Sequence, residues 1–321
     1  MKIKKEGEEN YSPGKVNIKV LGIGGSGCNV VDRMMKHNIK GVELVVLNTD
    51  IQDLEKVQAD KKVQIGAGIS KGFGAGMDPE IGRQAAEESK NEIKKIIQDV
   101  DLLFLSGGFG GGTATGALPS IAKMSQELKI PTIAVISMPF SFEGAYRRKV
   151  AQLGLDNLKN GVDSLVLIEN DKLLEVFDNK ITINNAFEEC DNILRQAVIG
   201  ITDLITKPGI VNIDFADIKS LIKDAGTSLF GIGYASGEKR AEEAAMEAIK
   251  SPLIGIPLEN TKGIIFNVSG NKGDVKMSEI NKIAEIITAE AHPDAKIIFG
   301  ATHDSTLKKG EIKVTVIATG F

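Results

Sequence analysis

Cysteine is scarce in this chain of 321 residues, which contains only Cys28 and Cys190. Two cysteines so far apart in sequence exclude a disulfide framework and offer no zinc-ligand pattern, so a reducing cytoplasm is the simplest setting. No apolar run reaches the roughly 20 residues that a membrane span needs. The first residues, 1–15, lack the apolar core of a signal peptide and are expected to form a flexible arm.

The chain also lacks a basic excess, because its formal net charge at pH 7 is −4. This balance argues against non-specific binding to nucleic acid, which depends on a positive surface. With 42% hydrophobic and 26% charged residues, the composition is that of an ordinary globular protein. The length predicts about two domains, each large enough for its own core.

Apolar strands and helices alternate along the first half of the chain. Such alternation favours an α/β fold with a parallel, doubly wound sheet, here predicted as a first domain over residues 16–182. The predicted strands cover residues 16–22, 42–48, 102–106, 132–137 and 164–168, and the predicted helices cover residues 28–36, 79–99 and 119–128.

A long helix interrupts this alternation at residues 183–207. Apolar residues recur there at spacings of three and four, which indicates an amphipathic helix. At 1.5 Å per residue it would span roughly 37 Å. We interpret residues 183–208 as a central helix that joins two domains and is ended by Pro208 and Gly209.

The remaining residues, 209–321, are predicted to form a smaller α+β domain with a four-stranded sheet. Its predicted strands cover residues 210–213, 263–269, 296–301 and 312–319, and its predicted helices cover residues 215–224, 238–248 and 278–292.

Three glycine-rich segments adjoin the predicted strands and helices of the first domain. Residues 22–29 contain Gly-x-Gly-x-x-Gly directly after a strand, which alone is compatible with a dinucleotide fingerprint or with a tight turn that binds nothing. Residues 107–116 form a second glycine-rich loop with two threonines, and residues 72–79 form a third that opens a helix. Loops at the carboxyl ends of parallel strands converge on one crevice, and their glycines let backbone N–H groups approach phosphates.

Together these motifs resemble those of FtsZ, the tubulin-like GTPase family of prokaryotic cell division, and the resemblance extends over residues 16–321. The matching segments are Asn48-Thr49-Asp50, Gly110-Gly111-Gly112-Thr113-Ala114-Thr115-Gly116, Pro139-Phe140-Ser141-Phe142-Glu143-Gly144 and Asn212-Ile213-Asp214-Phe215-Ala216-Asp217. The resemblance implies that residues 16–182 are a GTPase domain. It also implies a cytoplasmic protein that polymerises head to tail with itself, as in the mid-cell division ring, and that division adaptors are its partners.

The resemblance also implies which residues bind GTP or GDP. Glu143 would accept from the ribose hydroxyls with Arg147 near the same nucleotide, Phe187 would stack on the purine, and Asp191 would accept from the guanine N1–H and 2-amino groups. Without the resemblance, Phe187 is more simply a core aromatic and Asp191 a solvated helix residue. The expected contacts around the phosphates are Gly24, Gly25, Ser26, Gly27, Cys28, Asn29, Asn48, Gly74, Ala75, Gly76, Gly110, Gly111, Gly112, Thr113, Ala114, Thr115 and Gly116.

For catalysis the resemblance implies a loop that follows the central helix, with Asn212, Asp214 and Asp217. A helix of that length keeps the loop away from its own nucleotide, so it is expected to act in trans, on the nucleotide of the next subunit. The two carboxylates also suit the start of a helix, and both roles can hold together. Asp50 and Gln52 are expected near a Mg²⁺ ion on the phosphates, through water.

Three departures from the family pattern bear on activity. Ala114 replaces a usual glycine and is harmless if the residue is helical, which we expect. Asp78 replaces a usual asparagine and adds a negative charge near the expected γ-phosphate. The usual C-terminal adaptor-binding peptide is absent from the sequence. The alternatives are an FtsZ-like structural filament protein with little hydrolysis and, on residues 22–27 alone, a dinucleotide-dependent oxidoreductase.

Overall fold

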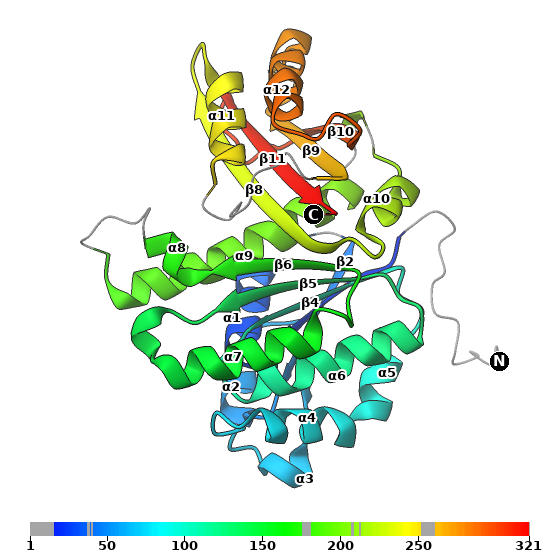
Figure 1. Ribbon diagram of the computed structural model, residues 1–321, viewed down its shortest axis with the longest axis vertical. Coiled ribbons are helices and arrows are strands. Elements are labelled where there is room, and N and C mark those ends of the chain that lie inside the picture. Colours follow the sequence, from blue (N-terminus) through cyan, green and yellow to red (C-terminus); the bar gives the residue numbers. More distant parts are fainter. Residues whose placement is uncertain are drawn as a thin grey trace, which may run out of the picture.

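The computed structural model describes residues 16–36, 39, 41–174, 181–206, 209–211, 213–251 and 261–320. The predicted arm at residues 1–15 lies outside this part of the chain. In the described residues the strands form one eleven-stranded mixed sheet in the order β3-β2-β1-β4-β5-β6-β8-β11-β9-β10-β7. The sheet has two halves, one formed by strands β1–β6 and the other by strands β7–β11 (Figure 1).

The first half of the sheet is parallel. Its strands are β1 (Ile18–Ile23), β2 (Val42–Asn48), β3 (Lys61–Gln64), β4 (Leu102–Gly108), β5 (Thr132–Met138) and β6 (Ser164–Glu169). The chain winds outward from β1 in both directions, which confirms the predicted doubly wound α/β fold. These strands are near-continuous apolar runs because helices cover both faces of the sheet.

Two sets of helices cover the two faces. On one face α1 (Gly24–Lys36) and α9 (Ile183–Thr206) pack in a common core. The opposite core contains α4 (Pro79–Glu88), α5 (Lys90–Ile97), α6 (Thr113–Glu127) and α7 (Ala145–Leu158). The short elements α2 (Ile51–Lys56), α3 (Ala67–Ser70), η1 (Ser141–Glu143) and α8 (Asn170–Leu174) lie in the connections.

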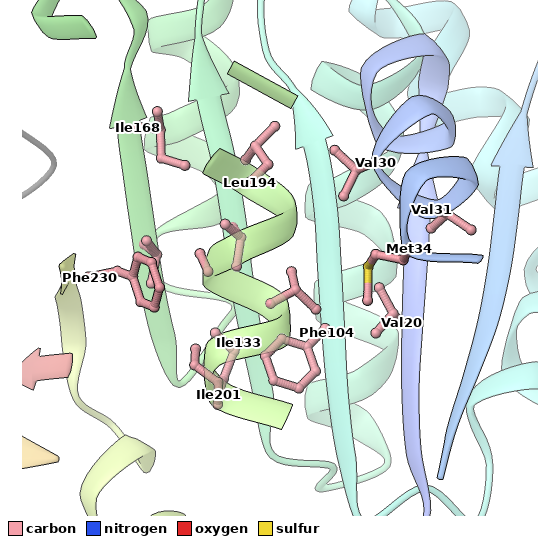
Figure 2. Close-up of a cluster of buried hydrophobic side chains, with 14 of the residues drawn as sticks. Val20, Val30, Val31, Met34, Phe104, Ile133, Ile168, Leu194, Ile201 and Phe230 are labelled. Carbon is pink, nitrogen blue, oxygen red and sulfur yellow. The ribbon is translucent and has the colours of Figure 1, made fainter. Parts of the chain in front are cut away.

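The core under α1 and α9 is shown in Figure 2. Met34 of α1 and Phe104 of β4 belong to this cluster, and Leu194 and Ile201 lie about two turns apart along α9. Phe230, from the second half of the sheet, closes the same cluster. All five side chains are buried. The predicted central helix therefore packs against both halves of the molecule.

The second half of the sheet is mainly antiparallel. It contains β7 (Gly209–Val211), β8 (Gly226–Ser236), β9 (Gly263–Gly270), β10 (Lys296–His303) and β11 (Glu311–Thr319). A short parallel pairing, Ser164 with Gly226, joins β8 to β6. The helices of this half are α10 (Phe215–Ile222), α11 (Arg240–Ile249) and α12 (Met277–Ala289). Among the residues described, no helix is both long and apolar enough to cross a membrane.

The structure corrects the prediction of a four-stranded second sheet. No element was predicted over Gly226–Ser236, which is a long strand, and β7 is only a short edge strand. Several glycines interrupt the apolar pattern of β8, so the strand is not evident from the sequence. Glycine is required at position 233, because a Cβ there would collide with the carbonyl oxygen of Ala244 on α11.

Two helix predictions also differ from the structure. The predicted helix over residues 79–99 is two helices, because the helix is interrupted at Ser89. The Oγ of Ser89 accepts from the N–H of Gly66 at 3.0 Å. The helix predicted over residues 119–128 begins six residues earlier, at Thr113, so that Pro119 lies inside it. A proline normally marks a first turn, but here the preceding turn is held by packing against α4.

Candidate functional site

A cavity of about 400 Å³ opens at the carboxyl ends of the parallel strands, where α1 and α6 begin. Twelve of the predicted site residues line it: Gly24, Gly25, Ser26, Asn29, Gly111, Gly112, Thr113, Ala114, Glu143, Arg147, Phe187 and Asp191. Its lining also includes six residues that were not among the predicted site residues: Gly108, Phe109, Ser137, Pro139, Asn170 and Cys190.

Two helix N-termini meet in this cavity. Gly24 begins α1 with a φ of +70°, and a Cβ at that position would lie 3.2 Å from the backbone nitrogen of Ala114 on α6. Free N–H groups and two helix dipoles therefore face the same space, which suits an anion. Ala114 lies in α6 and has no positive φ, so the expectation that this residue is helical is confirmed.

The third glycine loop supports the second loop from behind. A Cβ at Gly112 would lie 2.7 Å from the Cβ of Ala75 and 2.8 Å from the carbonyl oxygen of Asp78. The predicted contacts Gly74, Ala75 and Gly76 are therefore adjacent to the cavity but do not line it. Asp78 does not line it either, and its carboxylate caps α4 by accepting from the N–H of Glu80 at 2.9 Å.

Other predicted residues lie in the layer beneath the cavity. Gly27 and Gly116 allow close packing, since a Cβ would meet the carbonyl oxygen of Ser106 at the first and of Pro79 at the second. Thr115 Oγ1 accepts from the N–H of Gly110 at 3.0 Å and so fixes the loop. Cys28 and Asn48 are buried and, like the other residues of this paragraph, do not line the cavity.

Asp191 marks the opposite end of the cavity. Its side chain is buried, with the residue 8% exposed, and Ser26 Oγ donates to its Oδ1 at 3.3 Å. Burial raises the pKa of Asp191 to about 6, although Arg33, Ser26 and Asn29 oppose the shift. A buried carboxylate with few fixed donors is a ready acceptor for the donors of a ligand.

Asn170 was missed by the sequence analysis. It follows β6 directly, is buried, and its Oδ1 has no hydrogen-bond partner among the described residues. A buried acceptor of this kind calls for a donor from a bound molecule. Its position at a strand end, like that of the glycine loops, was the signal available in the sequence.

Phe187 and its neighbours form an aromatic cluster at the cavity. Phe187 is 39% exposed and stands edge-to-face to Phe140 at 5.3 Å, while Phe140 stacks on Phe142 at 4.9 Å. The interpretation of Phe187 as a core aromatic is therefore wrong, and its partly exposed ring is available to a planar ligand. The pKa of the Cys190 thiol is raised to about 12, mainly by burial and further by the negative charges of Asp191 and Glu143. The Cys190 thiol therefore stays protonated.

Glu143 and Arg147 form an ion pair on the cavity wall. Arg147 Nη1 lies 2.7 Å from Glu143 Oε2, and Glu143 Oε1 accepts from the N–H of Phe140 at 2.9 Å. Arg147 Nε is buried without a hydrogen-bond partner in the described part of the chain. The pair thus presents both a carboxylate and an unsatisfied N–H to a ligand.

The acidic residues predicted for catalysis and metal binding lie elsewhere. Asp214 caps α10, accepting from the N–H of Ala216 at 3.1 Å, and Asp217 pairs with Lys296 at 3.4 Å. Both acids are exposed and neither lines the cavity. Asn212 lies outside the described residues.

Asp50 caps α2 by accepting from the N–H groups of Gln52 at 2.9 Å and Asp53 at 3.3 Å, and neither Asp50 nor Gln52 lines the cavity. Across the described ranges, no three His, Cys, Asp or Glu side chains cluster as a metal site.

A doubly wound sheet with glycine loops at the strand ends defines a nucleotide-binding protein. Residues 17–178 match the GTPase domain of the Tubulin/FtsZ family, and residues 226–321 match the C-terminal domain of the FtsZ family. The chain therefore belongs to the tubulin/FtsZ family of GTPases, which implies that it binds a guanine nucleotide.

Individual relatives agree with this assignment. Cell division protein FtsZ 1 of Thermococcus kodakarensis is 44% identical over 306 residues, which are 95% of this chain and 81% of the relative. Cell division protein FtsZ of Neisseria meningitidis serogroup A is 43% identical over 95% of this chain and 78% of its own. A solved FtsZ dimer of M. jannaschii superposes with a TM-score of 0.91 at 40% identity, covering 95% of this chain and 88% of that one. These findings give no support to the dinucleotide-dependent oxidoreductase.

Proposed function

We propose that this GTPase polymerises head to tail into filaments and hydrolyses GTP at the interface between subunits, as part of a cytoplasmic cell-division ring at mid-cell. The names of its relatives as cell division proteins, and the dimer among the solved structures, support the proposal. Division adaptors are its proposed partners beyond itself.

The observation that carries the proposal is the place of the carboxylates. Among the described residues, the acids that line the cavity are Glu143, which is paired with Arg147, and Asp191, which accepts from Ser26 and is assigned to the guanine base. Neither is positioned to activate water beside a terminal phosphate. Asp214 and Asp217 are exposed acids that follow the far end of α9, and its 24 residues span about 36 Å. They can serve only the nucleotide of a neighbour.

In this arrangement the protein contributes position and charge. The carboxylates of Asp214 and Asp217, one helical turn apart, orient a water for in-line attack on the γ-phosphate of the adjoining subunit. The N-termini of α1 and α6 stabilise the negative charge of the phosphates. Because the contact joins two different faces, it generates a filament rather than a closed dimer.

Exposed apolar side chains at the nucleotide end support such a contact. Phe73 is 84% exposed, Ile51 44% and Met77 41%, and all three lie in or beside the loop that packs behind Gly112. At the other end of α9, Ile210 of β7 is 60% exposed. Apolar groups on both end faces suit a head-to-tail interface.

We further propose that Mg²⁺ accompanies GTP. Asp50 offers a carboxylate beside the third glycine loop, with its Oδ2 facing Gly74, so Asp50 and Gln52 could hold waters of the ion. When bound, Mg²⁺ neutralises charge on the phosphates. The helical Ala114 and the capping role of Asp78 weaken the case for a filament protein that does not hydrolyse GTP.

Mixed filaments test hydrolysis in trans. Asp214→Asn keeps the helix cap but removes the charge, so it should bind GTP and lose turnover, whereas Asp294→Asn, an equal change at an exposed site, should behave as wild type. Asp191→Asn keeps the catalytic loop but loses guanine recognition. In an equal mixture of the two inactive variants, about one junction in four places the intact catalytic loop of an Asp191→Asn subunit against the GTP bound by an Asp214→Asn subunit. Turnover should therefore return to about a quarter of the wild-type rate. A mixture that stays inactive contradicts the proposal.

A further inference from the structure

Thr49 joins the second and third glycine loops at the nucleotide cavity. It follows the end of β2, and its side chain is fully buried. Its Oγ1 lies 2.6 Å from Oγ1 of Thr113, the first residue of α6. Thr113 lines the cavity, whereas Thr49 does not. Thr49 therefore contacts the ligand-facing hydroxyl from behind.

The backbone of Thr49 also holds the third glycine loop. Its carbonyl oxygen accepts from Ser70 Oγ at 3.0 Å and from the N–H of Gly74 at 3.3 Å. The chain continues this pairing, since the N–H of Ile51 donates to the carbonyl of Gly72 at 3.2 Å. One residue thus connects the start of α6 with the loop that carries the exposed Phe73.

The direction of the hydroxyl pair follows from what the ligand can accept. A phosphate oxygen of a nucleotide accepts hydrogen bonds but donates none at neutral pH. If Thr113 donates its single hydrogen to a phosphate, the 2.6 Å contact can persist only with Thr49 as the donor to Thr113. That order polarises the Thr113 hydroxyl toward the phosphate and strengthens its bond.

We propose that Thr49 is a positioning residue for the terminal phosphate of GTP: it orients the Thr113 hydroxyl and couples it to the loop over residues 70–77. The inference rests on the proposed function, because it takes Thr113 as a phosphate contact. The terminal phosphate is assigned to this end because Gly112 abuts Ala75 and Asp78 here, whereas Asp191 and Asn170 line the base end.

Two pairs of variants that differ only in a hydroxyl test this assignment. Threonine in the wild type and valine in Thr49→Val have nearly the same side-chain shape, and the serine and alanine of Thr49→Ser and Thr49→Ala form a smaller pair that again differs in the hydroxyl. If Thr49→Val does not fold, the serine and alanine variants are compared instead. Calorimetric titration of the full-length chain with the non-hydrolysable analogue GMPPCP and with GDP, below the concentration of assembly, gives the two affinities. Thr202→Val is the matched control, because Thr202 is also buried and its hydroxyl donates to the carbonyl oxygen of Ile199 within α9.

Loss of the hydroxyl should weaken GMPPCP about 5-fold, the cost of the one neutral hydrogen bond that orients the Thr113 hydroxyl, and GDP less than about 2-fold. The serine variant should retain the wild-type preference for the triphosphate. Equal weakening of both nucleotides, or no weakening of either, overturns the role of Thr49. If wild type itself bound neither nucleotide, the proposed function would fail as well, whereas an unchanged valine variant beside a normal wild type refutes only this inference.

Discussion

Asp191→Asn should stabilise the nucleotide-free protein while destroying its guanine site. Burial raises the pKa of Asp191 from 3.8 to about 6. The unfolded chain ionises this acid more readily than the folded one, so folding stability falls as pH rises from about 4 to 6 and stays lower above that range. A shift of about two units corresponds to about 3 kcal/mol at 1.36 kcal/mol per unit. Asparagine removes that cost, and its Oδ1 still accepts from Ser26.

Urea denaturation followed by circular dichroism measures the effect. At pH 7.5 the variant should gain up to about 3 kcal/mol in free energy of unfolding, and at pH 5 the gain should shrink to about half of that, because the folded acid is then largely protonated while the unfolded acid is still ionised. Asp294→Asn, at an exposed site, controls for a general charge effect. The reasoning is refuted if the variant is less stable at pH 7.5, or if its gain is the same at both pH values.

The same substitution should change base selectivity. A carboxylate accepts from both the N1–H and the 2-amino group of guanine, but an amide presents a donor to one of them. GTP affinity should therefore fall about 100-fold or more, because a buried donor is left facing a donor. Xanthine carries a carbonyl in place of the 2-amino group, so XTP should bind the variant better than GTP does. Competition between the two nucleotides checks this outcome.

Three further perturbations address other parts of the molecule. Arg240→Ala removes the buried guanidinium that bonds Glu279 at 2.6 Å and should cost about 2 kcal/mol in urea denaturation, since it leaves the partly buried Glu279 carboxylate unpaired; unchanged stability would show that the pair is neutral. Phe187→Ala should weaken GTP by about 1–3 kcal/mol without altering the ratio of GTP to ATP affinity, and loss of that ratio would contradict the separate role of Asp191. Removal of divalent cations with EDTA should abolish turnover, which magnesium but not calcium excess should restore fully; undiminished turnover would exclude the proposed ion.

Much of the first half could be predicted from sequence because its elements depend on local pattern. A strand such as β4 is an unbroken apolar run since both faces are covered, and α9 repeats apolar residues at helical spacing over 24 positions. Packing decides what was missed. The absence of a side chain at Gly233 in β8 lets α11 approach the strand closely. The N-terminal turn of α6 is helical because Gly116 packs closely against Pro79. Neither contact is visible in the local sequence.

For the site, sequence predicted the loops better than the individual contacts. Glycine spacing indicates where backbone must approach a ligand, but Gly27 and Gly116 serve packing against Ser106 and Pro79 and do not line the cavity. Asn170 was missed because a single asparagine after a strand has many other uses. Its buried, unpartnered oxygen distinguishes it only once the fold is known.

The length of α9 links these observations to the proposed mechanism. Cys190 and Leu194 bury its first half in the core beneath the parallel sheet, and Ile201 buries its second half beside Phe230. Gly200 lets that ring approach, because a Cβ there would lie 2.9 Å from Phe230 Cε2. A helix held along its length keeps its ends apart. Phe187 and Asp191 lie roughly 29 and 23 Å along the helix axis from Thr206, a distance that no side-chain rotation can cover, and this separation supports the proposal that a second subunit brings the base site and the catalytic loop together.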